Sequence, residues 1–394
     1  HQAARGLKDA TAMEGARGRA GSVTREAALA FCRDAYDGHG KIEILPKIRV
    51  NSLAEMAVAY TPGVGHAVQE ILARPEALDE LTGRDNTIAI VTDGTAVLGL
   101  GRAGPRAALP VMEGKATMFK LLVGIDCMPL CVEARDASHL ADVVKALEPS
   151  FGGFNLEDVA SPGCFAVMQA LEERLEVPAI HDDQYGTATV VIAALTNALK
   201  VTGRRLQDLR VVVNGAGAAG TAAIRLLQAL GVGELLVHDR AGILTRRRRY
   251  EHAHWNEIAA SSNGACLEGD LAAAMAGADV FVGLSVARQV TPAMVRSMNR
   301  DPVVFGLANP DPEIMPDEAL AAGAAVVASG RFDFPNHCNN VLAFPSLMRG
   351  ALDTRARRVS HGMCLAAASA IAAAVPAQEL GPEHLLPSPL SPSP

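Results

Sequence analysis

The sequence predicts an α/β protein in which an N-terminal domain precedes a Rossmann-type domain built on a parallel sheet. The first observation behind this prediction is that short apolar runs typical of strands alternate with stretches of helical periodicity. The second is a glycine pattern, G-x-G-x-x-G, that follows one such run and opens a helical stretch. The strand-like runs are NTIAIVTDG, VGIDCMPLCVEA, LRVVVNGAG, ELLVHDRAG, ADVFVGLS, PVVFGLANP and AAVVAS.

Length and composition describe a globular protein whose partner is a small molecule. The 394 residues suffice for two or three domains, and 49% hydrophobic with 20% charged residues excludes a disordered chain. The net charge of −7 argues against general binding to nucleic acid or anionic membranes, because both depend on basic surface. No apolar run reaches the roughly 18 residues that cross a bilayer. The alanine-rich CLAAASAIAAAVPA therefore predicts a packed helix.

The cysteines and the N-terminal residues indicate a cytoplasmic protein. Seven cysteines are scattered without a C-x-x-C pair, which favours free thiols in a reducing compartment. The N-terminal residues lack the apolar core of a secretory signal, and we expect residues 1–22 to form a mobile leader. From Ser22 the sequence predicts a helix with a serine or threonine cap and a glycine stop.

The glycine pattern at Gly215, Gly217 and Gly220 predicts a dinucleotide-binding loop. It follows the strand-like RVVV, opens the helical run AAGTAAIRLLQALG, and leads to a second strand-like run ending at Asp239. In this arrangement the pyrophosphate lies at the helix N-terminus and the acidic residue binds the ribose hydroxyls. The predicted cofactor-binding residues are Gly215, Ala216, Gly217, Ala218, Ala219, Gly220, Asp239 and Arg240.

The same glycine pattern occurs at Gly99, Gly101 and Gly104, where we expect a structural loop. Pro105 follows the last glycine, and Pro110 stands where a dinucleotide-binding helix would continue. Proline lacks the backbone N–H and clashes with the preceding turn, so the two prolines argue against such a helix.

Asp239 favours NAD over NADP, because a carboxylate there binds the ribose and repels a 2′-phosphate. Arg240 and the run of four arginines at 246–249 keep NADP as the alternative, since arginine suits phosphate recognition. The arginine run itself is typical of a solvated loop.

Two pairs of adjacent carboxylates each follow an apolar stretch. Glu157 and Asp158 stand in GGFNLEDVASPGCF, and Asp182 and Asp183 stand in VPAIHDDQYGTA. A buried unpaired carboxylate is unfavourable, and open parallel sheets gather their ligands at the carboxyl ends of strands. Three carboxylates from two loops would suit a hard divalent cation such as Mg²⁺ or Mn²⁺. Either pair alone is equally compatible with a helix cap or a solvated end.

Histidines and cysteines offer no competing set with metal-ligand spacing. His252 and His254 are expected in a polar loop, and Cys127 and Cys131 in the core. A nucleotide cofactor beside an oxygen-ligated cation indicates hydride transfer from an alcohol whose oxygen and neighbouring carboxylate chelate the cation. The cation then polarises the new carbonyl and accepts electrons released by decarboxylation.

Several long motifs resemble those of the short bacterial malic enzymes, in order from about residue 39 to 390. They are GKIEILPKIRV, MAVAYTPGV, VTDGTAVLGLG, PVMEGKATMFK, FGGFNLEDVASP, IHDDQYGTA, VVVNGAGAAG, LANPDPEIMP, GRFDFPNHCNNVLAFP and ELGPEHLLPSPL. The resemblance implies oxidation of L-malate with NAD(P)⁺, decarboxylation, and release of pyruvate. A homodimer is the family expectation.

The resemblance also implies roles for single residues. Lys115 in MEGKA would be the general base, and Tyr60 in AYTPGV would protonate the enol carbon. A lysine base needs its pKa lowered by desolvation and nearby cationic charge. The remaining assignments are metal binding by Glu157, Asp158 and Asp183, charge tuning of Lys115 by Asp182, substrate carboxylate binding by Asn309 and Asn340, and cofactor binding by Asn309.

The sequence departs from the family pattern at a few places. Tyr185 stands where the pattern often carries histidine, VGLSVARQV replaces a turn containing Ala-Pro-Gly, and NHCNN replaces NQVNN. The loop around the arginine run hardly matches, so the choice between NAD and NADP does not carry over from it.

Four segments are predicted: the leader 1–22, a substrate and metal domain 23–185, an NAD(P)-binding Rossmann domain 186–350, and a C-terminal helix and tail 351–394 that packs back on the N-terminal domain. Two alternative functions compete with the predicted malic enzyme activity. A metal-independent amino-acid dehydrogenase has the same domain order, and a nucleotide-binding sensor would have lost its catalysis.

Overall fold

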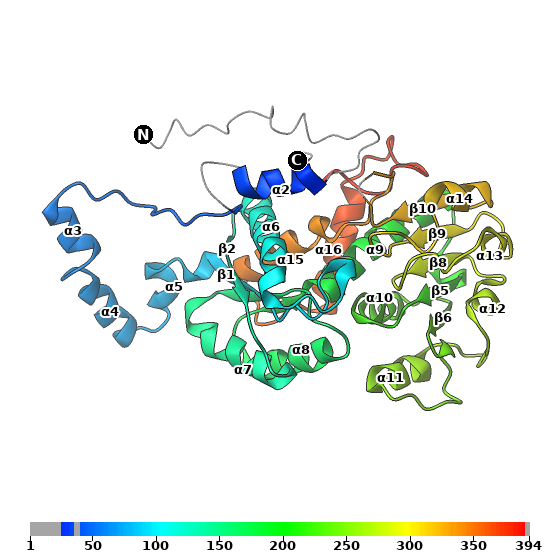
Figure 1. Ribbon diagram of the computed structural model, residues 1–394, viewed down its shortest axis with the longest axis horizontal. Coiled ribbons are helices and arrows are strands. Elements are labelled where there is room, and N and C mark those ends of the chain that lie inside the picture. Colours follow the sequence, from blue (N-terminus) through cyan, green and yellow to red (C-terminus); the bar gives the residue numbers. More distant parts are fainter. Residues whose placement is uncertain (1–24, 35–39, 332, 391–394) are drawn as a thin grey trace.

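A computed structural model describes residues 25–34, 40–331 and 333–390, in which two separate β-sheets follow one another along the chain (Figure 1). The predicted leader at 1–22 and the predicted helix start at Ser22 lie outside these residues. The α/β class with a parallel-sheet Rossmann-type domain is confirmed.

The first sheet has four parallel strands in the order β2-β1-β3-β4. Helix α6 packs on β1 and β2, and helix α8 packs on β4. Both predicted acidic pairs follow the carboxyl end of a strand, the first after β3 and the second after β4. The strands are β1 (Thr87–Thr92), β2 (Asp126–Cys131), β3 (Gly153–Leu156) and β4 (Ala179–His181).

The second sheet has six strands in the order β10-β9-β8-β5-β6-β7, all parallel except that β7 runs antiparallel to β6. Its parallel strands are almost wholly buried, as expected for a sheet covered on both faces. The strands are β5 (Arg210–Asn214), β6 (Glu234–Asp239), β7 (Gly242–Ile243), β8 (Val280–Gly283), β9 (Val303–Gly306) and β10 (Val326–Ser329).

The helices follow the sequence order in two groups. Those before the second acidic pair are α2 (Arg25–Asp34), α3 (Leu53–Ala59), α4 (Val64–Ala73), α5 (Ala77–Leu81), α6 (Pro105–Val123), α7 (Ala137–Leu147) and α8 (Gly163–Arg174). Those from it onward are α9 (Asp182–Thr202), α10 (Ala218–Ala229), α11 (Ala253–Ser261), α12 (Leu271–Met275), α13 (Pro292–Arg296), α14 (Pro316–Ala321), α15 (Phe344–Asp353) and α16 (His361–Ala373). Short 3₁₀ turns are η2 (Arg84–Asn86), η3 (Leu98–Leu100), η4 (Glu148–Ser150), η5 (Leu206–Asp208) and η6 (Asn340–Leu342).

Helix α9 joins the two sheets. It begins directly after β4 and ends at Gly203, whose positive φ of 66° suits a helix C-terminus. Most of its side chains are buried, because it packs against both α10 and α16. Asn197 of α9 donates to the carbonyls of Ala372 and Leu385, both at 2.8 Å, which ties the C-terminal segment to this helix. The predicted division at 185/186 falls inside α9 and stays a prediction.

The predicted structural loop precedes helix α6, which runs from Pro105 to Val123 although the two prolines argued against a helix there. Pro105 occupies the first helical position, where a missing N–H leaves no bond unmade. Pro110 lies inside the helix and removes one backbone bond. The helix is nevertheless held by a buried face that includes Met112 and Phe119. Tertiary packing therefore outweighs the local cost of the second proline.

No helix in the described part of the chain is long and apolar enough to span a membrane. Two of the N-terminal helices stand apart from the body. Helices α3 and α4 bury no side chain, and Figure 1 shows them projecting away from the first sheet.

Candidate active site

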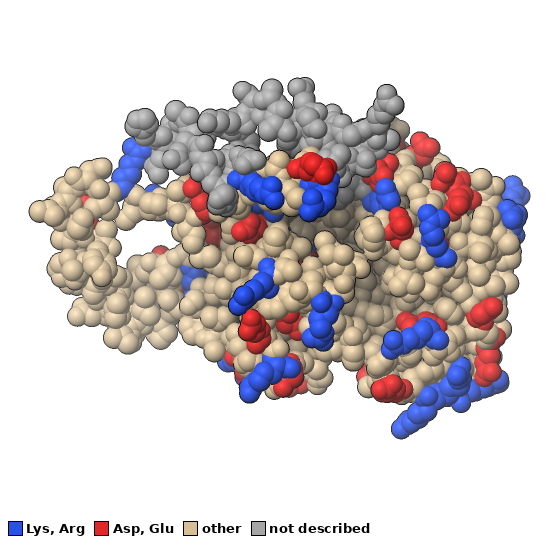
Figure 2. Space-filling model, viewed as in Figure 1, with Lys and Arg blue, Asp and Glu red and all other residues tan. Residues whose placement is uncertain are grey.

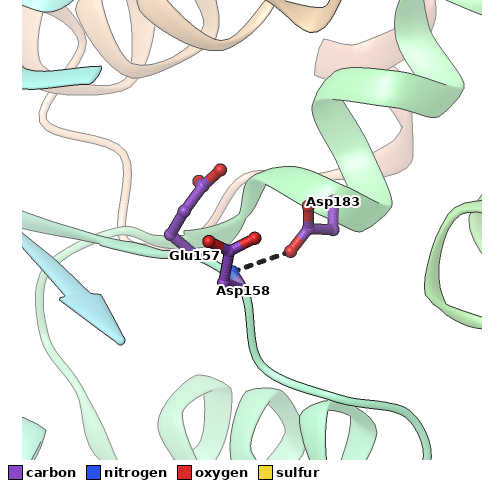
Figure 3. A group of neighbouring side chains, drawn as sticks. All are labelled: Glu157, Asp158 and Asp183. Atoms are coloured by element: carbon purple, nitrogen blue, oxygen red, sulfur yellow. Dashed lines mark hydrogen bonds between the residues drawn. The ribbon is translucent and has the colours of Figure 1, made fainter. Parts of the chain in front are cut away.

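Three carboxylates converge where β3 and β4 end. Glu157 and Asp158 come from the loop after β3, and Asp183 comes from the first turn of α9. One oxygen of each lies within 4.8 Å of the others, and Figure 3 shows the three groups side by side. Glu157 and Asp158 are each only 4% exposed, so both carboxylates are largely shielded from water at the edge of the sheet. The structure thus brings together the three residues predicted to bind a metal.

One oxygen of Asp183 lies close to two neighbouring nitrogen atoms. The backbone N–H of Asp158 donates to Asp183 Oδ2 at 3.0 Å, the bond drawn in Figure 3. The ring Nε2 of His181 lies 3.1 Å from the same oxygen. The side-chain amide of Gln184 contacts the other ring nitrogen of His181 at 2.9 Å, which fixes the orientation of the buried ring.

Lys115 on α6 lies beside this cluster. Its ammonium donates to Glu157 Oε1 at 2.5 Å and to Asp182 Oδ2, and it stands 4.4 Å from the ring centroid of Phe344. Asn340 donates to the same oxygen of Asp182 at 2.7 Å. Lys115 is 8% exposed and Asp182 is fully buried, so these contacts are shielded from water. The predicted base, its tuning carboxylate and one predicted substrate-binding residue are therefore neighbours.

Burial and the neighbouring charges shift the pKa of each group. Burial raises the pKa of Glu157 to about 8, against the opposing effect of Lys115, and raises the pKa of Asp158 to about 6. Burial lowers the pKa of Lys115, but the carboxylates of Asp182 and Glu157 outweigh it and raise that pKa above its ordinary value. A general base requires a lowered pKa, so the negative charge of the carboxylates must be offset before Lys115 can accept a proton.

The predicted dinucleotide loop joins β5 to α10. Gly215 has φ of 107°, and a Cβ there would lie 2.5 Å from the carbonyl oxygen of Leu284. Gly217 caps α10 without a side-chain bond, so the first N–H groups of the helix have no side-chain cap. Asp239 at the end of β6 accepts the N–H of Ala216 at 2.6 Å. The loop has the glycine-dependent backbone and the helix start without a side-chain cap that a pyrophosphate requires.

Helix α11 supports this loop. The expectation of a polar loop is wrong for His254, which lies buried on α11, whereas His252 precedes the helix as its N-cap. His254 and Trp255 both donate to the carbonyl of Ala216, at 3.0 and 3.2 Å. Arg240 contacts His252 at 2.9 Å and stands over the Trp255 ring at 5.4 Å. The four arginines at 246–249 are exposed, as predicted.

Two predicted residues lie outside the buried cluster. Tyr60 follows α3 and is 71% exposed. Asn309 is exposed at the end of β9, beside the loop of the first glycine pattern: a Cβ at Gly99 would lie 2.8 Å from the Asn309 carbonyl oxygen. The first glycine pattern therefore packs the first sheet's loop against the second sheet's loop.

Sequence reasoning missed three residues that shape the site, namely His181, Phe344 and Glu313. Glu313 is fully buried and accepts the N–H of Ser285 at 2.9 Å and of Ala308 at 3.1 Å, which ties together the loops after β8 and β9. A Cβ at Gly283 would lie 2.4 Å from the carboxyl carbon of Glu313. A side chain at position 283 would therefore clash with the buried carboxylate. The histidine adjoining the second acidic pair was the one available signal.

Sequence comparisons connect this geometry to one family. Residues 39–144 match the family model described as the malic enzyme N-terminal domain, and residues 184–391 match the malic enzyme NAD-binding domain. The second match alone covers more than half of the chain. It contains the dinucleotide loop, Asp239, Asn309 and Asn340.

Similar proteins and solved structures are described as malic enzymes as well. The chain is 46% identical to the bifunctional malic/malolactic enzyme of Bacillus subtilis, over 89% of this chain and 86% of that protein. It is 47% identical to the NAD-dependent malic enzyme of Geobacillus stearothermophilus, over 89% of this chain and 73% of that protein. The crystal structure of malic enzyme from Pyrococcus horikoshii superposes with a TM-score of 0.89 at 44% identity, over 93% of this chain and 86% of that one. The chain belongs to the malic enzyme family.

Proposed function

We propose that the protein oxidises L-malate with NAD⁺, decarboxylates the product and releases pyruvate and CO₂. The observation that carries this proposal is the convergence of Lys115 with four buried or half-buried carboxylates at the edge of the first sheet. Such a cluster can hold a cation and a proton acceptor side by side, as an alcohol oxidation followed by decarboxylation requires. Family membership supports the same reaction.

The proposed cation is Mg²⁺ or Mn²⁺, held by Glu157, Asp158 and Asp183. These residues fit a hard cation, because all three supply carboxylate oxygens and Asp158 Oδ2 is buried without a hydrogen-bond partner. A bound cation would act as a Lewis acid that polarises the substrate oxygen and stabilises the negative charge released by decarboxylation. It also offsets the carboxylate charge that raises the pKa of Lys115.

The proton steps are assigned to residues of the chain. Lys115 Nζ takes the hydroxyl proton of malate after passing one of its own protons to Asp182, whose pKa is raised by burial. Tyr60 then protonates the enol carbon. Asn340, held by Asp182, and Asn309 bind the substrate carboxylates. The buried position of Lys115 excludes bulk water from the first of these transfers.

The proposed cofactor is NAD, bound by the loop from Gly215 to Gly220 with Asp239 at the ribose. Asp239 supports NAD because its carboxylate would repel a 2′-phosphate, whereas Arg240 is already engaged with His252 and the Trp255 ring. The proposed enzyme is cytoplasmic and homodimeric. All seven of its cysteines are free, and α3 and α4 bury no side chain within their own chain.

The test measures reduced-nicotinamide absorbance with L-malate and NAD⁺ or NADP⁺, with Mn²⁺ or with a chelator, while pyruvate is assayed in parallel. We expect metal-dependent reduction, equal amounts of pyruvate, and a preference for NAD⁺. Lys115→Ala should abolish both signals, and Gly350→Ala, six residues after Phe344 on α15, serves as the control because a Cβ there would meet nothing within 4 Å.

The two alternative functions predict different results, and neither is favoured by the comparisons. Reduction that survives the chelator and uses an amino acid would identify an amino-acid dehydrogenase. Cofactor binding without turnover of malate would identify a sensor. Either result overturns the proposal.

A further inference from the structure

A cavity of about 230 Å³ lies where β1, β2 and β3 end. Its walls come from the loops that follow these strands and from the starts of α7 and α8, two helices that pack together (Figure 1). Among the described residues, neither Lys115 nor any of the three proposed metal ligands lines it. At roughly 30 Å³ per water molecule the cavity holds about seven waters, so it suits a small ligand.

The topology of the first sheet supports a ligand site at this position. In the order β2-β1-β3-β4, β2 lies on one side of β1, and β3, the next strand along the chain, lies on the other side. Open parallel sheets bind ligands outside the carboxyl ends of their strands, at the point where the strand order reverses in this way. Asp93 and Thr95 follow β1, Ser161 follows β3, and all three line the cavity.

Two arginines that line the cavity have no partner for their charge. Arg102 follows η3, Arg135 follows β2, and neither guanidinium forms a hydrogen bond or an ion pair within the described residues. The acidic residues of the wall are already engaged. Asp93 accepts the backbone N–H and the hydroxyl of Thr95 at 3.0 and 2.6 Å, and Asp136 caps the first turn of α7. The free charge of the cavity is therefore positive.

Unpaired guanidinium groups stand out on this surface. Arg84, for comparison, binds Asp79 at 2.6 Å. On the face drawn in Figure 2, the basic side chains of the body lie mostly beside acidic ones, as the net charge of −7 leads one to expect. Arginine binds carboxylate and phosphate groups through two parallel hydrogen bonds. Two such groups at one cavity match a ligand that carries two negative charges.

The start of α8 adds to the positive potential. Gly163 is the first residue of this helix, which has no side-chain cap among the described residues, so its first N–H groups carry partial positive charge. A Cβ on Gly163 would meet nothing within 4 Å, which shows that the cavity is open at this wall. The helix end reinforces the two arginines but does not define the site by itself.

The wall of the cavity is bonded to the proposed metal ligand Asp158. The backbone N–H of Ala96 donates to the Asp158 carbonyl at 2.9 Å, and the N–H of Ala160 donates to the hydroxyl of Thr95 at 2.9 Å. Asp158 has φ of 55°, a conformation that few residues other than glycine adopt, so the bonds around it hold it there. A ligand that orders residues 159–161 would therefore also order Asp158.

We propose that the cavity binds a small organic dianion, a phosphate monoester or a dicarboxylate, between Arg102 and Arg135, and that this ligand strengthens cation binding by the adjacent carboxylates. The second half of the inference rests on the proposed function, which assigns the cation to Glu157, Asp158 and Asp183. The ligand is a regulator and not a substrate, because Lys115 does not line the cavity.

The first test is calorimetric titration of the full chain without metal, with methyl phosphate and with succinate, at a pH where both are dianions. We expect saturable binding of at least one probe, and the probe that binds identifies the ligand as a phosphate ester or a dicarboxylate. Arg102→Gln and Arg135→Gln should each weaken binding by about 10-fold or more, the effect of losing one charge-assisted hydrogen bond. Arg106→Gln, at a 95% exposed side chain outside the cavity, should bind as the wild type does.

Two further variants locate the bound probe. Lys115→Ala should retain binding, because a probe held in the proposed active site would depend on this lysine. Gly163→Glu should abolish binding, since it places a carboxylate in the open part of the cavity, and an acid in the first turn of α8 favours the helix. Circular dichroism verifies that Gly163→Glu is folded. The proposal is overturned if neither probe binds, if Lys115→Ala removes binding, or if Arg102→Gln and Arg106→Gln have equal effects.

The second test measures Mn²⁺ affinity by electron paramagnetic resonance, with and without the probe that binds. We expect the Kd for Mn²⁺ to fall by about fivefold or more, and Mn²⁺ should tighten binding of the probe by the same factor. The effect should vanish in Arg102→Gln and persist in Arg106→Gln. An unchanged Kd, or a chain that binds no Mn²⁺, overturns the coupling. A protein that shows both effects but forms no pyruvate from malate would refute the proposed function and leave this inference standing.

Discussion

Gly186 lies one turn after Asp182 on α9 and leaves no room for a side chain. A Cβ at this position would overlap Asp182 Oδ1, lie 2.9 Å from its Cγ and lie 3.3 Å from the Cβ of Asn340. Restoring an ordinary contact of 3.4 Å needs a shift of about 0.5 Å at Cγ and more than about 1 Å at Oδ1. Asp182 cannot simply rotate away, because its other oxygen is held by Lys115 and Asn340.

We expect Gly186→Ala to lower kcat by about 100-fold, since a 1 Å misplacement of catalytic groups has an effect of that order. The expected change in stability is small. Alanine favours the helix by about 1 kcal/mol, and overpacking costs about 1 to 3 kcal/mol, so the net destabilisation is about 0 to 2 kcal/mol. The variant should therefore be folded and nearly inactive.

The assay combines steady-state kinetics with urea unfolding of Gly186→Ala and of Gly350→Ala. Gly350 lies in the interior of α15, where an added Cβ meets nothing within 4 Å. The control should gain up to about 1 kcal/mol of stability and keep its kcat. A kcat of Gly186→Ala within threefold of wild type would refute the coupling between Asp182 and Lys115.

Three further predictions follow from the same geometry. His181→Asn should weaken Mn²⁺ binding by about 10- to 100-fold, measured by electron paramagnetic resonance, because Asp183 loses the 3.1 Å contact with the buried imidazole that orients it; unchanged affinity would contradict that role. Burial raises the pKa of Glu157 to about 8, so the folded state without metal binds this proton more tightly than the unfolded state does. The contribution of Glu157 to the free energy of unfolding therefore falls as pH rises from about 4.5 to about 8. Because Mn²⁺ binds the ionised carboxylate, it should raise Tm more at pH 8 than at pH 6. Gly220→Ala, whose Cβ would overlap the carbonyl oxygen of Gly215 at 1.8 Å, should force the loop backbone to shift and abolish NAD⁺ binding in fluorescence titration, while the fold survives in circular dichroism.

Much of the site was predictable because its signals are local. The dinucleotide loop needs glycines at fixed spacing between a strand and a helix, and the structure places Gly215 and Gly220 there. The acidic pairs were predictable as strand-end residues, since parallel strands present their carboxyl ends at one edge. That shared edge is why Glu157 and Asp183 converge although 26 positions separate them.

The rest depends on packing that no local pattern encodes. The helix after Gly104 forms despite Pro110 because its buried face packs on the first sheet, and sequence rules for proline do not include that contribution. Glu313 is one of 43 acidic residues, and nothing near it in sequence shows that two loop N–H groups close around its carboxylate. The exposure of Tyr60 depends on the position of helices α3 and α4, which the motif around it does not determine.

The course of α9 bears on how members of this family can be recombined. Its 21 residues span about 30 Å. The N-terminal end places Asp182 and Asp183 in the proposed active site, and the remainder packs against α10 and α16. A chimera spliced at residue 184 would join segments of two homologues within the first turn of α9. A mismatch in helix orientation at that junction would move Asp182 and Asp183. Exchange of cofactor preference between homologues should therefore transplant strands β5 to β7 with their loops and keep α9 from the recipient, so that the carboxylates stay in register with their own sheet.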